Sequence, residues 1–140
     1  MIAGVGIDIV DLASFEGQLA DRASGFVEGT FTSRERDLAR LRPTEPARHL
    51  AARFAAKEAF VKAFDGARFG LTPIMERVDL REVEVVSDAF GRPGLRLHGR
   101  VADAFDAAGF TCPHLSLTHD GGYAAAVVTL ERLDPQPPIP

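Results

Sequence analysis

The opening segment of the chain restricts its fold most strongly, because its residues alternate with a period of two. One side of residues 2–10 carries Ala3, Val5, Ile7 and Ile9. The other side carries Gly4, Gly6 and Asp8. This period predicts a half-buried β-strand, and its second face is unusually bare. Glycines in a strand more often mark a bulge or tight packing, but here they also leave room for a bulky group beside the Asp8 carboxylate.

Helix and strand signals follow along the rest of the chain. Helices are predicted from Asp11 or Ser14 to about Gly25, from Thr32 to about Leu41, from Thr44 and Pro46 to Asp65, and over 101–108. Thr32 and Glu35 form a capping-box pattern, and Gly66 and Gly109 are expected to end the last two helices. Further strands are predicted over 82–86, 95–98, 114–119 and 123–130. This order predicts an α+β fold with a mostly antiparallel sheet packed with helices.

The length of 140 residues corresponds to one domain, predicted over residues 1–132, with 133–140 as a flexible tail. Cys112 is the single cysteine, which indicates a reducing compartment and an inert thiol. No apolar run is long enough to span a membrane, and we expect a cytoplasmic protein. The net charge of −4 argues against general nucleic-acid binding.

Positive charge is concentrated in residues 32–62, which hold eight basic and four acidic side chains. This surplus is compatible with an acidic partner, with a phosphorylated ligand or with an ordinary solvated helix surface. Of the 16 basic residues in the chain only Lys57 and Lys62 are lysines, and both lie in this segment.

The long helix places a lysine among apolar side chains. Its predicted buried stripe consists of Leu50, Phe54, Val61 and Phe64. Lys57 falls within the same arc, so it must either extend to solvent or reach a buried anion. Glu58 and Lys62 lie one turn apart on one flank of the helix. They form either a surface ion pair or a site at which the carboxylate holds a metal and the lysine holds a phosphate.

A third segment that carries polar side chains is His114 to Asp120. Strand alternation puts His114, Ser116 and Thr118 on one face and His119 on the other. These histidines are either hydrogen-bonded structural residues or ligands. The two carboxylates Asp8 and Glu58, with basic residues around them, suit a magnesium ion that completes its coordination shell with waters and phosphate oxygens.

These motifs together resemble the holo-acyl-carrier-protein synthases, the small type of 4'-phosphopantetheinyl transferases. The resemblance rests on Gly4-x-Gly6-x-Asp8, on Arg53-Phe-Ala-Ala-Lys57-Glu58-Ala-Phe-x-Lys62-Ala63 and on Ser116-Leu-Thr-His119, and it runs from about residue 1 to 132. It implies transfer of phosphopantetheine from coenzyme A to a serine of an apo acyl carrier protein, in fatty acid biosynthesis. The other product is adenosine 3',5'-bisphosphate.

The resemblance also implies roles for individual residues. Asp8 and Glu58 would bind Mg²⁺, and Asp8, Glu58 and Lys62 would be the catalytic residues. Lys62 would contact the phosphate on the pantetheine side, and the further phosphate or nucleotide contacts would be Arg53, Lys57, His114 and the turn Gly91-Arg92-Pro93. This turn would approach the nucleotide of a neighbouring subunit, because the family is homotrimeric with active sites between subunits.

Two alternatives and one departure stand beside this hypothesis. A magnesium-dependent nucleotide hydrolase would use the same carboxylates, and a non-catalytic nucleotide-binding module would need only part of the site. The departure concerns carrier docking, because the first helix has Ser14 and Glu16 where many family members have a basic residue. We expect the complementary basic surface instead from Arg34, Arg36, Arg40, Arg42 and Arg48.

Overall fold

The computed structural model describes residues 1–42 and 45–133. Its elements are β1 (Ile2–Asp11), α1 (Leu12–Ala20), the 3-10 turn η1 (Arg22–Ser24), α2 (Phe26–Thr30), α3 (Ser33–Arg40), α4 (Pro46–Gly66), η2 (Leu80–Glu82), β2 (Val83–Ser87), β3 (Pro93–Leu97), α5 (Gly99–Ala107), β4 (Phe110–Asp120) and β5 (Tyr123–Arg132). The predicted tail lies mostly outside the described residues. Among the helices described, none is long and apolar enough to cross a membrane.

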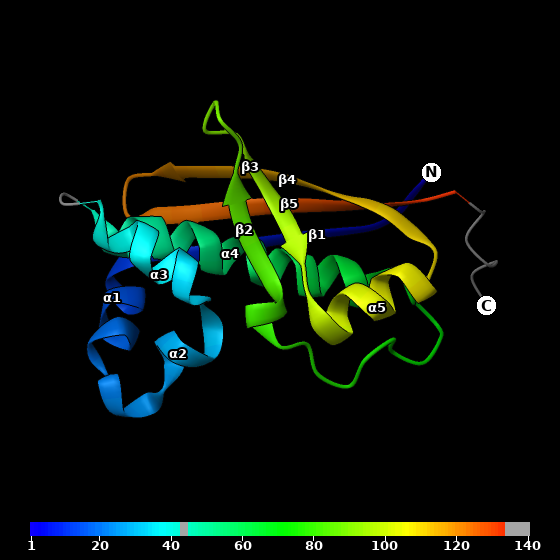
Figure 1. Ribbon diagram of the computed structural model, residues 1–140, viewed down its shortest axis with the longest axis horizontal. Helices are drawn as coiled ribbons and strands as arrows, with labels where there is room; N and C mark the ends of the chain where they lie inside the picture. Colours follow the sequence, from blue (N-terminus) through cyan, green and yellow to red (C-terminus); the bar gives the residue numbers. More distant parts are fainter. Residues whose placement is uncertain (43–44, 134–140) are drawn as a thin grey trace.

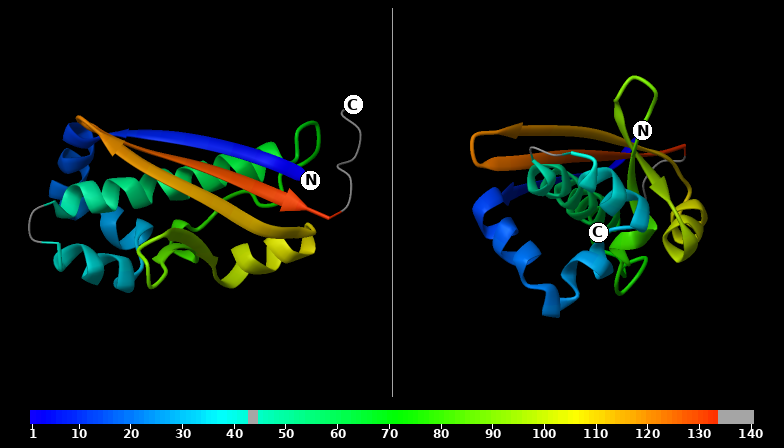
Figure 2. Two further views of the ribbon diagram at one scale, coloured as in Figure 1. Left: turned by 90° about the horizontal axis from the view of Figure 1, so that it is seen from above. Right: turned by 60° about the vertical axis from the view of Figure 1, so that its left-hand side comes forward.

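The strands form two antiparallel sheets, which confirms the predicted α+β class. The larger sheet has the order β1-β5-β4, and β2 pairs with β3 in a separate hairpin. Helix α4 runs along one face of the larger sheet (Figures 1 and 2). Helices α1, α2 and α3 gather near one end of α4, and α5 lies near its other end. In the hairpin, β2 packs against α4 and β3 lies beside β4. The long helix is therefore the centre of the fold.

The bare face of β1 is its buried face. A Cβ atom at Gly4 would overlap the carbonyl oxygen of Ala63, and one at Gly6 would overlap that of Ala59. The backbone of α4 therefore packs directly on β1, which confirms tight packing as the reason for the glycines. Val5, Ile7 and Ile9, on the opposite face, are 60%, 63% and 65% exposed in the single chain.

Local signals explain where several helices begin. The Asp11 side chain accepts a hydrogen bond from the Ser14 amide at 2.8 Å and caps α1. Thr32 and Glu35 form both halves of the predicted capping box of α3. The first predicted helix ends earlier than expected, because α1 stops at Ala20 and the 3-10 turn η1 follows it. The separate helix α2, which begins after Gly25 with φ +67°, was not predicted.

Burial around α4 is broader than the predicted stripe. Leu50 and Phe64 are buried as predicted, but Phe54 and Val61 are only half-buried. Much of the remaining buried surface comes from small side chains, namely Ala51, Ala52, Ala55, Ala56, Ala59 and Ala63. These alanines let the sheet and the flanking elements approach α4 closely from several directions.

Candidate active site

Asp8, Glu58 and Lys62 come together where β1 crosses α4. The Lys62 ammonium donates to Asp8 Oδ1 at 2.8 Å and to the Ile7 carbonyl oxygen at 3.0 Å. Burial raises the pKa of the Glu58 carboxyl, the nearby Asp8 carboxylate raises it further, and Lys62 offsets part of this rise. Of the two possibilities left open for Glu58 and Lys62, the simple ion pair between them is not the one that forms, because Lys62 pairs with Asp8.

This pair of carboxylates fits a divalent cation that is held only in part by protein. The Asp8 carboxylate lies near enough to raise the pKa of Glu58, so two like charges are neighbours here, an arrangement that a cation relieves. Within the described residues, no group of three or more His, Cys, Asp or Glu side chains could enclose a metal ion. Magnesium commonly takes one or two carboxylates and completes its shell with waters and phosphate oxygens.

Lys57 does not lie in this site, and the structure contradicts its expected contact with a phosphate. Its side chain is fully buried, and its ammonium lies 2.9 Å from Glu35 Oε2 and donates to the carbonyl oxygens of Leu80 and Val83 at 2.8 Å. These three partners use all three of its protons. Lys57 therefore reaches a buried anion, one of the two possibilities its position in the helix allowed.

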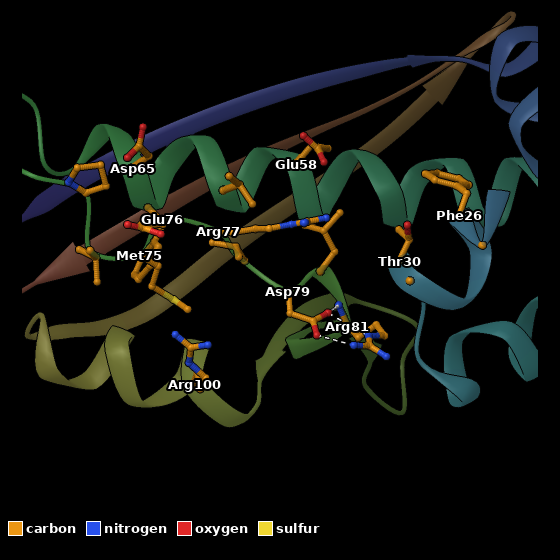
Figure 3. Close-up of a pocket in the computed structure, with 18 of the residues that line it drawn as sticks. Phe26, Thr30, Glu58, Asp65, Met75, Glu76, Arg77, Asp79, Arg81 and Arg100 are labelled. Atoms are coloured by element: carbon orange, nitrogen blue, oxygen red, sulfur yellow. Dashed lines mark hydrogen bonds and ion pairs between the residues drawn. The ribbon is translucent and has the colours of Figure 1, made fainter.

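A pocket of about 1030 Å³ opens beside Glu58. Its walls come from α2, from the C-terminal half of α4, from the segment 73–81 and from α5 (Figure 3). Three arginines line it, Arg77, Arg81 and Arg100. Sequence analysis missed all three, because they lie in a loop without periodicity or beyond the recognised motifs.

A second pocket, of about 380 Å³, contains Arg53, Gly91 and Pro93 of the predicted nucleotide contacts. Arg53 is 8% exposed, and its guanidinium donates to the His49 carbonyl oxygen at 3.2 Å. Burial, with Arg53 and Arg42 nearby, lowers the pKa of His49 to about 4. Arg42 and Arg48 also line this pocket. His49, which no sequence pattern singled out, is therefore part of a strongly basic hollow.

The remaining predicted contacts lie outside both pockets. Arg92, at the β2–β3 turn, binds Asp88 Oδ2 at 2.6 Å and stacks on Phe90 with 5.0 Å between the guanidinium carbon and the ring centre. His114 lies on the exposed face of β4, with its Nε2 3.2 Å from Glu131 Oε1. In a single copy of the chain, the predicted nucleotide contacts therefore lie on several separate surfaces.

Comparisons of the sequence and of the structure with known proteins agree on one family. Residues 4–128 match the family model of the 4'-phosphopantetheinyl transferase superfamily. The chain is 47% identical over 130 residues to a holo-[acyl-carrier-protein] synthase of Mycobacterium tuberculosis, covering 93% of this chain and 97% of the relative. A solved complex of the Chronobacterium ammoniagenes synthase with coenzyme A superposes with a TM-score of 0.86 at 38% identity, covering 94% and 98% of the two chains. The solved M. tuberculosis acyl carrier protein synthase gives 0.74 at 44% identity, covering 94% and 99%.

Proposed function

The chain belongs to the 4'-phosphopantetheinyl transferase superfamily, and we propose that it performs the transfer at the site formed by Asp8, Glu58 and Lys62. The reaction moves the 4'-phosphopantetheine group of coenzyme A to a serine of an apo acyl carrier protein. The products are the holo carrier and adenosine 3',5'-bisphosphate. The observation that carries this assignment is the meeting of Asp8, Glu58 and Lys62 at the β1–α4 crossing, beside a pocket that Glu58 lines.

The chemistry needs a cationic environment, a nucleophile and a proton acceptor. The carrier serine hydroxyl attacks the pantetheine-side phosphorus, the new P–O bond forms, and the bond to the bisphosphate breaks. Lys62 stabilises the negative charge on the phosphate oxygens. Glu58, whose pKa is raised, is the protein group best suited to accept the serine proton. Asp8 orients Lys62 through their 2.8 Å contact.

Asp8 and Glu58 would hold magnesium in this site. The bound ion would neutralise charge on the diphosphate, which makes the bisphosphate a better leaving group. The two carboxylates leave several positions for waters and phosphate oxygens, as magnesium requires.

A homotrimer with sites shared between copies is supported by two features of the single chain. Val5, Ile7 and Ile9 form an exposed apolar strip on β1, and the neighbouring Val127 of β5 is 40% exposed. Such a contiguous apolar face is typical of a protein–protein interface. In addition, the pocket that Glu58 lines shares no lining residue with the pocket of Arg53, Gly91 and Pro93. Contact between copies would bring these two halves into one site.

The carrier needs a basic docking surface that α1 does not offer. In the segment expected to provide it, three arginines are matched by nearby acids, as in the pairs Arg36–Glu28, Arg40–Asp37 and Arg48–Glu45. Arg34 and Arg42 take part in no ion pair among the described residues. Docking of an acidic carrier is therefore best sought around Arg34 and Arg42.

We also propose that the reaction takes place in the cytoplasm.

Incubation with coenzyme A, Mg²⁺ and an apo carrier tests the function. Wild-type protein should add the mass of phosphopantetheine to the carrier, and Asp8→Asn and Glu58→Gln should each abolish most of the transfer. Asp106→Asn, on the exposed side of α5, is the control and should retain activity. Release of bisphosphate without a carrier would instead identify a hydrolase. Ligand binding that keeps its magnesium dependence in both variants would identify a binding module.

A further inference from the structure

Arginines line the pocket beside Glu58, but they differ in how their charge is matched. Arg81 is held by Asp79, with contacts of 3.0 Å and 2.7 Å to the two carboxylate oxygens. Arg77 and Arg100 take part in no ion pair with any residue that the structure describes. The pocket therefore contains two guanidinium groups that are free to bind an anion.

Arg77 is carried by a segment that is fixed on both sides. Met75 and Val78 pack partly buried against the hydrophobic core. Shortly afterwards, the Leu80 carbonyl oxygen accepts a hydrogen bond from the buried Lys57 ammonium at 2.8 Å. In Figure 3 the Arg77 side chain extends along the α4 wall of the pocket toward the turn that carries Glu58, whereas Arg100 points in from the α5 side. The base of Arg77 is thus held in place while its charged end stays in the pocket.

The site needs a further cation for phosphate binding. Lys57 is enclosed and fully hydrogen-bonded, and Lys62 already contacts Asp8 and the Ile7 carbonyl oxygen. A guanidinium can bind two phosphate oxygens at once through its planar set of N–H donors. Among the arginines of this pocket, Arg77 has both an unmatched charge and a side chain directed along α4 toward Glu58.

We propose that Arg77 binds the phosphate on the pantetheine side of coenzyme A, in the pocket beside Glu58. This inference rests on the proposed function and adds a binding residue to it. Arg77 then adds a second cation to the phosphate contact that sequence analysis gives to Lys62. Because the phosphate that Arg77 holds is the one transferred, the residue is expected to affect ligands that contain this phosphate and to leave adenosine 3',5'-bisphosphate unaffected.

Direct binding measurements by titration calorimetry with Mg²⁺ separate these ligands. For Arg77→Gln we expect the affinity for coenzyme A and for 4'-phosphopantetheine to fall at least tenfold, with bisphosphate affinity unchanged within twofold. Arg77→Lys should restore only part of the loss, because a lysine lacks the planar donor set. Arg22→Gln, at an exposed arginine of η1 that lines neither pocket, is the control and should bind all three ligands like wild type.

Two results would overturn the proposal. Unchanged coenzyme A affinity in Arg77→Gln, with a raised KM for the carrier, would show that Arg77 contacts an acidic group of the carrier instead. An equal loss of affinity for bisphosphate would show that the substitution disturbs the site in general. Transfer by wild-type protein is measured in parallel. If wild type forms no holo carrier, the proposed function itself fails, whereas normal transfer with unaltered coenzyme A binding in Arg77→Gln refutes only the role of Arg77.

Discussion

The two lysines of α4 lie five residues apart and belong to regions with opposite properties. Lys57 is on the side of the helix away from the sheet, where its ammonium is enclosed by Glu35, Leu80 and Val83. Lys62 lies at the crossing with β1, where its side chain is 54% exposed and contacts Asp8. The first region joins α3, α4 and η2 to one another, and the second is open to a substrate.

Because of this difference in burial, we expect Lys57 to stabilise the fold and Lys62 to act in the reaction. A fully buried ammonium with three partners has no proton left for a ligand, so Lys57 can act only through the fold. An exposed ammonium beside a carboxylate contributes little to stability, because solvent screens the pair. Substitution of the two lysines should therefore give opposite results in unfolding and activity measurements.

The largest effect is expected for Lys57→Met. Loss of the ammonium leaves the Glu35 carboxylate buried without its cation, which should lower the free energy of unfolding by about 3–5 kcal/mol. Urea denaturation measures this change. The double variant Lys57→Met, Glu35→Met should recover part of the loss, since no uncompensated charge remains. A single variant as stable as wild type would remove the structural distinction between the two lysines.

Lys62→Met should show the reverse behaviour. Loss of a cation that stabilises charge on the phosphate should reduce kcat by roughly 10²–10³-fold. The free energy of unfolding should change by less than about 1 kcal/mol, because the pair with Asp8 is exposed. Steady-state transfer assays and urea denaturation of the same preparation provide both values. A variant that keeps its kcat would contradict the catalytic role of Lys62.

Substitution of Ile7 tests whether another copy of the chain completes the active site around Lys62. The Ile7 carbonyl oxygen binds Lys62, whereas its side chain is 63% exposed on the opposite face of β1. Ile7→Glu should convert a trimer to monomers in light scattering and lower activity, with circular dichroism of the folded chain retained. Leu133→Glu introduces the same charge at another exposed apolar residue and should leave assembly unchanged. A trimeric Ile7→Glu protein would show that the apolar strip is not the interface.

The smallest effect concerns His49, at the beginning of α4. Its pKa is about 4 in the folded protein against 6.5 for an unperturbed histidine, so the unfolded chain binds more protons between these values. Stability should therefore fall as the pH decreases from about 6.5 to 4, by about 1–2 kcal/mol once partial solvent screening is allowed for. Urea denaturation across this range should be flatter for His49→Gln. A wild-type curve without this slope would argue against the burial of His49.

Features that depend on neighbouring residues could be predicted from the sequence. The capping box joins Thr32 and Glu35, three positions apart, and the long helix follows from its composition and from Pro46. Asp8, Glu58 and Lys62 were selected through motif resemblance, and the fold brings them together.

Other features depend on partners far along the chain. Glu35 lies 22 residues before Lys57, so nothing local indicates that this lysine is enclosed. The packing of α4 decides which face of β1 is buried, and alternation alone describes both faces equally well. Arg77 lies in a segment without helix or strand periodicity, so only the folded chain reveals the pocket that it lines.

The contact of Gly6 with α4 limits how this protein can evolve. Every other amino acid adds a Cβ, and this atom would overlap the carbonyl oxygen of Ala59. That oxygen belongs to the main chain and is present whatever residue occupies position 59. A harmful substitution at Gly6 therefore has no suppressor at the facing residue, and the codon for this glycine should be recovered only by true reversion in a genetic screen.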